Sequence, residues 1–307
     1  MNDLMRYSRV SFAWVLLVFV LAMVFRIVVL DVPGMSDDMV YMDYADGYFE
    51  EFGTFTVKQA QKPLRLGLLL PLVASQSLFG YSLTAYYVVS IGHYLLLLIG
   101  IYLVASSIGS RITGIMSVLF ASTWVSILAT TTRLRPDIPN AAYFLMAFAV
   151  FVMVLKKDNS KFDRRLVLVS FLAFLGYLCK MPNSVFLVAL PVAEWIERRS
   201  IRRSLCVALM MLGLVFLECV WYWVYWGDPF WRIRIVFFIV DDWPARRMHP
   251  ISLETYLTGP FKAVFCSASA WLLGLLALFS VARAIAVRSS YLIGLFAGGV
   301  VVLIAYG

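Results

Sequence analysis

Long apolar runs alternate with short polar segments along most of the chain. Most of these runs approach or exceed the roughly 17–25 residues that a helix needs to cross a bilayer, and they lack the alternation of β-strands. The pattern predicts an all-α polytopic membrane protein, a bundle of about nine transmembrane helices. The expected spans are residues 10–30, 83–107, 112–131, 139–155, 165–180, 183–195, 204–226, 263–282 and 291–306.

A shorter apolar run, residues 65–80, follows the first span and ends in Phe79-Gly80. As a helix it would be about 24 Å long, against about 30 Å of hydrocarbon. If it does not cross and the N-terminus is cytoplasmic, the cytoplasmic segments hold 14 of 26 Lys/Arg and 5 of 18 Asp/Glu. The outer segments then balance at −1, in agreement with the positive-inside rule. We therefore predict a juxtamembrane helix in or on the outer leaflet.

This topology places every unusual polar cluster on one side of the membrane. The clusters lie in a first outer loop, residues 31–82, in residues 133–139, at Lys180, and in a second large outer loop, residues 227–262. Segments far apart in sequence would thus meet at one membrane face. We interpret this convergence as a site on the extracytoplasmic face of a multi-pass protein of the plasma or inner membrane.

Composition agrees with this interpretation. The chain is 62% hydrophobic and 14% charged, with a mean hydropathy of +0.86, whereas soluble domains are about 45–50% apolar and about 25% charged. The net charge of +8 fits the topology of a polytopic protein and does not call for a nucleic-acid partner. The four cysteines show no C-x-x-C spacing, so we predict neither a metal site nor a disulfide framework.

Two adjacent carboxylates follow the first span in the sequence "SDDMVYMDYAD". Asp37 and Asp38 would point about 100° apart on a helix, so they cannot act as one pair on a shared face. We expect a helix from Asp38 to about Glu51, with Asp37 at its N-terminus and an apolar side formed by Tyr41, Ala45, Tyr48 and Phe49. A solvated capping pair and a catalytic pair are both open interpretations.

Basic residues on the outer face run against the positive-inside rule. Arg133, Arg135 and Lys180 lie where outer segments meet spans, beside carboxylates. Such a cluster indicates that an anion is bound, and in an outer leaflet a lipid phosphate, which arginine binds bidentately, is the natural candidate. We interpret the lone Arg26 as a side chain that snorkels to the headgroups, and His93 as a buried polar residue with a partner.

Several short motifs follow one another in a fixed order. They are Asp37-Asp38 with Tyr41 and Ala45, Lys62-Pro63, Phe79-Gly80, Arg133 and Arg135 with Asp137, Leu178 with Lys180 and Pro182, Trp221-Tyr222, and His249-Pro250 with Tyr256-Leu257. This order resembles the membrane glycosyltransferases of the GT-C fold that use polyprenyl-phosphate sugars, such as protein O-mannosyltransferases and lipid A aminoarabinose transferases. Two positions depart from the family pattern, because Asp38 replaces a frequent Glu and a second proline after Pro63 is missing. The departures concern the donor sugar more than the reaction class.

The resemblance implies an inverting glycosyltransferase that moves a sugar from a polyprenyl-phosphate donor to a lipid, glycan or protein acceptor outside the cytoplasm. It implies Asp37 as the catalytic base and Asp38 as a second carboxylate that orients acceptor or sugar. No cofactor is required, although adjacent carboxylates near a phosphate leave a divalent metal open. The implied donor-phosphate ligands are Arg135, Lys180, Lys62, Arg133 and His249, and further substrate contacts are Tyr41, Asp137, Arg65 and Tyr256.

The same resemblance implies that residues 1–307 form one GT-C-like transmembrane module. We expect that the C-terminal part found in family members is absent from it. A transporter or flippase of a lipid-linked or anionic substrate is the alternative. Transporters usually show internal repeats and broken helices at the midplane, whereas the charges here gather at one face. A scaffold protein is a third possibility, but it would need no cluster of acids and cations.

Overall fold

A computed structural model of the chain describes residues 12–30, 33, 37–48, 62–124, 127–128, 131, 133–156, 164–180, 190–191 and 201–232. These residues form eight α-helices, and this part of the chain contains no strand, which confirms the all-α prediction. They belong to two compact units. One comprises Met1–Lys180 with Val224–Gly227, and the other comprises Met181–Trp223 with Asp228–Gly307.

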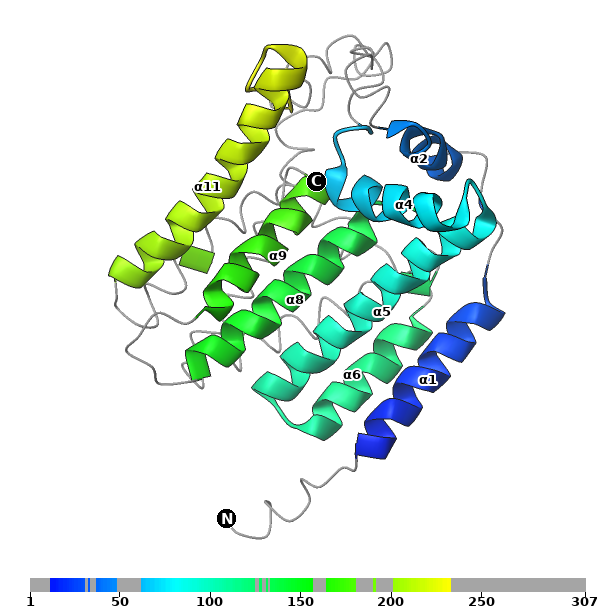
Figure 1. Cartoon of the computed structure of the whole chain (residues 1–307). Helices are drawn as coiled ribbons and strands as arrows, with labels where there is room; N and C mark the ends of the chain where they lie inside the picture. The colour runs from blue at the N-terminus through cyan, green and yellow to red at the C-terminus, as the bar shows by residue number, and fades with distance from the viewer. Residues whose placement is uncertain are drawn as a thin grey trace, which may run out of the picture. The chain divides into compact units, whose positions relative to one another are not determined.

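Five helices of the first unit lie side by side in a row (Figure 1). Each contacts its neighbours in the order α1, α6, α5, α8, α9, so α6 packs between α1 and α5. Helices α1, α6 and α9 run toward one end of the row, and α5 and α8 run away from it (Figure 1), so that end gathers the C-termini of α1, α6 and α9 and the N-termini of α5 and α8. Their bounds are α1 Phe12–Val28, α5 Leu83–Ile108, α6 Arg111–Thr123, α8 Asp137–Lys156 and α9 Arg165–Cys179.

Helix α4 (Leu66–Phe79) runs across this end of the row (Figure 1). It contacts α5, α8 and α9, and the short helix α2 (Asp37–Ala45) packs against it. The helix stops at Gly80, whose φ of 66° suits glycine and whose N–H donates to the Gln76 carbonyl at 2.7 Å. The predicted short helix and its end at Phe79-Gly80 are therefore confirmed, and its course across the row supports the prediction that it is not a span.

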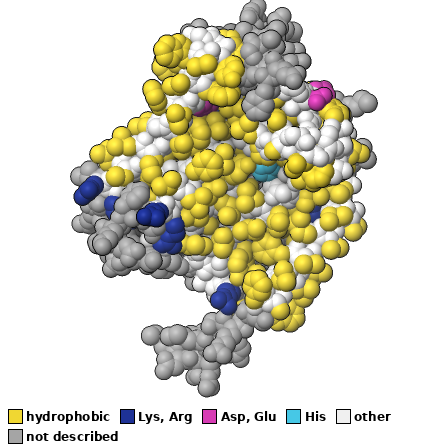
Figure 2. All heavy atoms as spheres, in the orientation of Figure 1, with side chains coloured by type: hydrophobic (Ala, Val, Ile, Leu, Met, Phe, Trp, Pro, Cys, Tyr) yellow, Lys and Arg dark blue, Asp and Glu magenta, His cyan; other side chains and the backbone are white. Residues whose placement is uncertain are grey.

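Three helices of the described part have the length and composition of a membrane span. They are Leu83–Ser107 of α5, Asp137–Val154 of α8, and Arg202–Trp226 of α11 (Ile201–Trp226) in the second unit. Helices α1, α4, α6 and α9 are apolar but shorter. The described surface in Figure 2 is largely hydrophobic, as expected of an integral membrane protein. The number of about nine spans stays a prediction, since residues 263–282 and 291–306 lie outside the described part.

Two helix ends differ from the sequence-based prediction, because local backbone geometry stops the helices early. Helix α6 ends at Thr123 and not near residue 131, with Trp124 already extended at ψ 115°. Helix α2 begins at Asp37 as expected but ends at Ala45, before Gly47 at a φ of 68°. The apolar run continues past Thr123, so hydrophobicity alone does not mark the end of α6.

Glycine allows the closest helix contacts in the first unit. A Cβ atom added to Gly67 of α4 would lie 2.4 Å from the Leu175 carbonyl oxygen and 2.5 Å from Cys179 Sγ, both in α9. A Cβ on Gly100 of α5 would lie 2.7 Å from the Leu145 Cβ of α8. Small residues at such positions let helix backbones approach in apolar surroundings, so Gly67 fixes how closely α4 can lie on the end of α9.

We predict that Gly67→Ala displaces α4 from α9 and destabilises the fold by about 1–3 kcal/mol, the usual cost of overpacking. The buried Cys179 thiol should then react faster with a maleimide, measured in a variant whose other three cysteines are Ser. Gly92→Ala in α5 is the matched control, because its Cβ would meet nothing within 4 Å. Unchanged labelling of Cys179 in Gly67→Ala would contradict the proposed contact.

Candidate active site

Two buried hydrogen bonds hold helix α2 against the segment that leads into and forms α4. The Gln76 side-chain amide donates to the Met42 carbonyl at 3.0 Å, and the Tyr48 hydroxyl donates to the Pro63 carbonyl at 2.8 Å. The predicted apolar side is confirmed for Tyr41 and Ala45 of α2 and for Tyr48 just after it, which are all buried, while Phe49 lies outside the described residues. Helix α2 and its carboxylates therefore keep a fixed position relative to α4.

Two further contacts join side chains of α2 to residues that flank α4. Arg65 donates a hydrogen bond to the Tyr41 hydroxyl, and its guanidinium carbon lies 5.8 Å from the centre of the Tyr41 ring. The Tyr81 hydroxyl donates to Asp43 Oδ1 at 2.6 Å, and this bond to a carboxylate raises the pKa of Tyr81 to about 12. The structure thus joins two predicted substrate-binding residues, Tyr41 and Arg65, directly to one another.

The two candidate catalytic carboxylates occupy the first turn of α2. Asp37 is the first residue of the helix, and its side chain lies outside the described part of the structure. Asp38 is 1% exposed and lies within electrostatic reach of Tyr86 of α5. Tyr86 is also hydrogen-bonded to the Leu134 backbone and within reach of Arg133. The first acid-bearing turn and the arginine-bearing segment therefore meet around one tyrosine that sequence reasoning missed.

The segment of residues 133–137 turns sharply before α8 begins. The Arg135 N–H donates to the Arg133 carbonyl at 2.9 Å. Both arginines therefore lie in a short, tightly turned segment outside the helices. Pro139 falls in the first turn of α8, where a missing N–H costs no helical hydrogen bond. Arg133 is partly buried and Arg135 is exposed. Because both directly precede α8, they lie at the end of the row that α4 crosses.

Lys180 and Asp137 form an ion pair, with Lys180 Nζ donating to Asp137 Oδ1 at 2.8 Å. Lys180 directly follows α9 in an extended conformation, and Asp137 is the first residue of the adjacent α8. Their side chains are 26% and 47% exposed, so solvent weakens the pair and it adds little to stability. Asp137, a predicted substrate contact, thus also orients a predicted phosphate ligand.

Lys62 lies in the turn that precedes α4, where its carbonyl accepts a hydrogen bond from the Arg65 N–H at 3.1 Å. His249 and Tyr256, the last two predicted site residues, lie outside the described residues. Within the described ranges, no three His, Cys, Asp or Glu side chains come close enough together to hold a metal ion. A divalent ion therefore stays an untested possibility.

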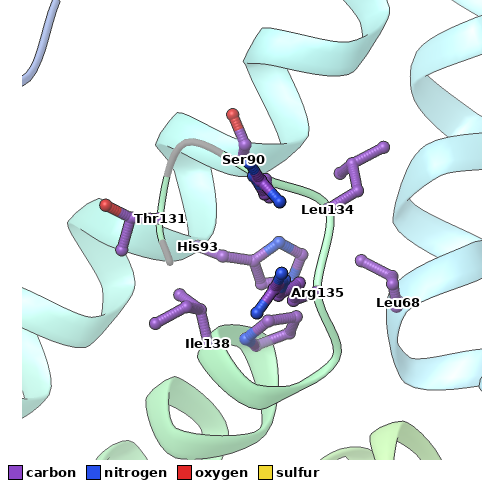
Figure 3. Close-up of a pocket in the computed structure, with 9 residues that line it drawn as sticks. Leu68, Ser90, His93, Thr131, Leu134, Arg135 and Ile138 are labelled. Carbon is purple, nitrogen blue, oxygen red and sulfur yellow. The ribbon is translucent and has the colours of Figure 1, made fainter. Parts of the chain in front are cut away.

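A small pocket lies where α5 faces the 131–139 segment (Figure 3). Its volume is about 10 Å³, on the order of what one water molecule needs. A sugar phosphate is far larger, so the pocket is not a complete substrate cavity. It shows only where the two arginines come close to α5. Arg133 and Arg135 are the predicted site residues in its lining, which also contains Leu68, Ser90, His93, Thr131, Leu134, Ile138 and Pro139.

His93 in this lining links three helices. Its Nδ1 lies 2.9 Å from the Val89 carbonyl, and its Nε2 lies 3.1 Å from the Tyr143 hydroxyl of α8. The Tyr143 hydroxyl also approaches the Gly67 carbonyl of α4 at 3.5 Å. The prediction that His93 is a buried polar residue with a partner is confirmed, and its contacts hold α4 and α8 in place beneath the arginines.

The interpretation of Arg26 as a snorkelling side chain is wrong. Arg26 is 0% exposed, and its Nη2 donates a hydrogen bond to the Thr131 carbonyl. It shares a buried stripe of α1 with Val18 and Ala22, at helical spacing. Because α1 is apolar on every side, the sequence does not show which face points inward, and the arginine could not be placed from its pattern.

The second unit contains a separate buried ion pair. Arg232 Nη1 donates to Glu218 Oε1 at 2.6 Å, and the Tyr222 hydroxyl donates to the same oxygen at 3.1 Å. The two charged side chains are 5% and 4% exposed. Breaking such a buried pair leaves an uncompensated charge, so this contact ties residues 228–232 to α11. It also explains how α11 accommodates an acidic residue within an apolar helix.

The chain was compared with known families, proteins and structures. A family model described as dolichyl-phosphate-mannose-protein mannosyltransferase matches residues 62–223, more than half of the 307 residues. The matched range includes the cation-bearing residues Lys62, Arg65, Arg133, Arg135 and Lys180. No curated protein sequence and no solved structure matches the chain. The chain therefore belongs to the dolichyl-phosphate-mannose-protein mannosyltransferase family, and it is an integral membrane glycosyltransferase that uses a lipid-linked sugar donor.

Proposed function

We propose that this protein is an inverting glycosyltransferase that moves a sugar from a polyprenyl-phosphate donor to an acceptor on the extracytoplasmic side of the membrane. The observation that carries the proposal is that Asp38 of α2 and Arg133 both lie within electrostatic reach of Tyr86, in a chain of this family. The charge distribution of a multi-pass protein of the plasma or inner membrane supports the outer side.

In the proposed reaction an acceptor hydroxyl attacks the anomeric carbon of the sugar, on the face opposite the lipid phosphate. Asp37 takes the proton of that hydroxyl as its oxygen–carbon bond forms. The bond between the anomeric carbon and the phosphate oxygen breaks, and its electron pair leaves with the polyprenyl phosphate. One displacement inverts the configuration. Asp38, buried beside Tyr86, is assigned to orienting acceptor or sugar.

The leaving phosphate gains negative charge as the bond breaks, so cations placed there stabilise the transition state. We assign this role to Arg135 and Lys180, with Lys62, Arg133 and His249 as further contributors. The phosphate departs as a stabilised anion, so this scheme needs neither a nucleotide nor a metal. The acceptor, whether lipid, glycan or protein, and the polyprenyl chain would reach the site along the bilayer.

The remaining candidates act around these groups. We assign Tyr41 and Arg65, which bond to each other, and Tyr256 to contacts with the sugar or acceptor. The ion pair at 2.8 Å supports a more specific role for Asp137, which is to hold Lys180 in the orientation that meets the phosphate. A residue that sets the direction of a flexible lysine reduces the entropy lost when the donor binds.

Asp37→Asn should lower kcat by about 10²–10⁴-fold, because the amide cannot accept the proton, while donor affinity stays close to that of the wild type. Asp43→Asn, an exposed position on the same helix, is the control and should keep most of the activity. The measurement is transfer from a polyprenyl-phosphate sugar by the full-length protein. Near wild-type turnover in Asp37→Asn would rule out this base.

Arg135→Ala should raise the KM for the donor by about tenfold or more, since it removes a charge-assisted contact to phosphate. The side chain is exposed and outside the core, so the melting temperature should stay within a few degrees of the wild type. Arg164→Ala removes an exposed arginine from the opposite end of α9 and should leave KM unchanged. Equal effects of the two substitutions would point to net charge alone.

A double-mutant cycle separates the two roles open to Asp137. If Asp137 acts by orienting Lys180, Asp137→Asn raises the donor KM several-fold, and the double variant with Lys180→Gln is no worse than Lys180→Gln alone. The free energy of unfolding should change by less than about 1 kcal/mol, as for exposed ion pairs. Fully additive losses in kcat/KM would instead assign Asp137 its own contact with the substrate.

A further inference from the structure

Arg26 is a buried cation whose hydrogen-bonding capacity is only partly used. One guanidinium nitrogen, Nη2, donates to the Thr131 carbonyl, while Nε and Nη1 are buried and have no hydrogen-bond partner among the residues that the structure describes. The charge also lacks a carboxylate neighbour in the described part, where its electrostatic neighbours are Tyr86, Tyr87 and Tyr94. A buried charge is costly unless it is paired, so this arrangement is complete only with an anion beside it.

Tyr94 provides a second unused group at the same place. The Arg26 guanidinium carbon lies 5.9 Å from the centre of the Tyr94 ring. The Tyr94 hydroxyl is buried, and no described residue forms a hydrogen bond with it. The N–H groups of these two unpartnered nitrogens and the Tyr94 hydroxyl are all able to donate to an oxyanion. A guanidinium presents its donors in a planar fork that fits the oxygens of a phosphate.

The position along α1 fits a phosphate attached to a lipid. Arg26 is two residues from Val28, the last residue of this apolar helix, and the end of an apolar helix marks the edge of the hydrocarbon layer. Helix α1 forms the edge of the row (Figure 1) and exposes much of its apolar surface. Thr131, which Arg26 contacts, lines the pocket that contains Arg133 and Arg135.

We propose that Arg26 and Tyr94 form a further anion-binding site that takes the phosphate of the lipid-linked donor. The site lies between α1 and α5, next to the arginine-bearing pocket, and it binds the phosphate oxygens through Arg26 Nε and Nη1 and the Tyr94 hydroxyl. This inference rests on the proposed function, because that function supplies the lipid phosphate. It assigns α1, which the family match does not include, a direct part in donor recognition.

The competing explanation is that Arg26 only fixes the backbone at Thr131 and so positions the segment that follows. Arg26→Gln separates the two, because the glutamine amide can still donate to the Thr131 carbonyl but carries no charge. A positioning role would appear as a lower melting temperature with unchanged phosphate affinity. A ligand role would appear as a loss of phosphate affinity that Arg26→Lys partly restores.

The test is a calorimetric titration of polyprenyl monophosphate into the purified full-length protein in detergent free of phospholipid. Arg26→Gln should raise Kd about tenfold or more, as expected for a lost charge-assisted contact, and Tyr94→Phe about threefold. Arg111→Gln, an exposed arginine at the other end of the row, is the charge control and should stay within about twofold. Uncharged polyprenol should bind equally weakly to the wild type and to Arg26→Gln.

The outcomes distinguish the inference from the proposed function. If the wild type binds polyprenyl monophosphate and Arg26→Gln and Tyr94→Phe bind it equally well, the Arg26 site is wrong and the proposed function stands. If the wild type does not bind it, the proposed function itself fails. Phosphatidylglycerol is titrated in parallel, and an equal dependence on Arg26 for both lipids would assign the site to a bilayer phospholipid and overturn its assignment to the donor. Should Arg26→Gln not fold, Tyr94→Phe and Arg26→Lys decide the question.

Discussion

The arrangement of the first unit depends on the close contact between Gly67 of α4 and the last turn of α9. An added Cβ would lie 2.5 Å from Cys179 Sγ, so only glycine lets α4 lie this close across the end of the row. Cys179 directly precedes Lys180, and Lys62 and Arg65 directly precede α4. The single contact therefore brings basic residues more than 100 positions apart in sequence to the same end of the unit. Tyr143, held by His93 at 3.1 Å, approaches the Gly67 carbonyl and adds α5 and α8 to the same junction.

Electrostatics explains why this end suits an anion. Arg133 and Arg135 precede α8 and Lys180 follows α9, so all three cations lie at the same end of the row of apolar helices. The Lys180–Asp137 pair is too exposed to add much to stability, so its use lies in fixing a direction for the lysine. Arg26 is a buried cation of which one nitrogen donates to a carbonyl and two have no partner among the described residues. A transporter pathway would instead place charges near the midplane, and membership of a glycosyltransferase family favours the enzyme.

Hydrophobic length and turn residues were sufficient to predict α1, α5, α8, α9 and α11 to within a few residues, because an apolar run bounded by charges can form little else in a bilayer. They also predicted α4 and its stop at Gly80. They failed at the end of α6, which is set by the backbone geometry at Trp124. They also failed for Arg26, whose burial depends on which face of an apolar helix meets its neighbours. No local pattern encodes the order of the row, with α6 between α1 and α5. For that reason the sequence predicted Asp38 and Arg133 as site residues but could not show that both lie within electrostatic reach of Tyr86.

The family match begins at residue 62, after both candidate catalytic carboxylates. The proposal that Asp37 is the base therefore depends on how α2 is held against the matched region. Met42 and Tyr48 of the α2 region bond to Gln76 and Pro63 through buried contacts, and Tyr41 adds a third with Arg65. Several buried bonds on successive turns leave a nine-residue helix little freedom to rotate. The first turn of α2 is thus held by the same helix that sets the position of Lys180. An acid on this turn and a cation after α9 are thereby tied to one helix, as the proposed reaction requires of its base and its phosphate ligand.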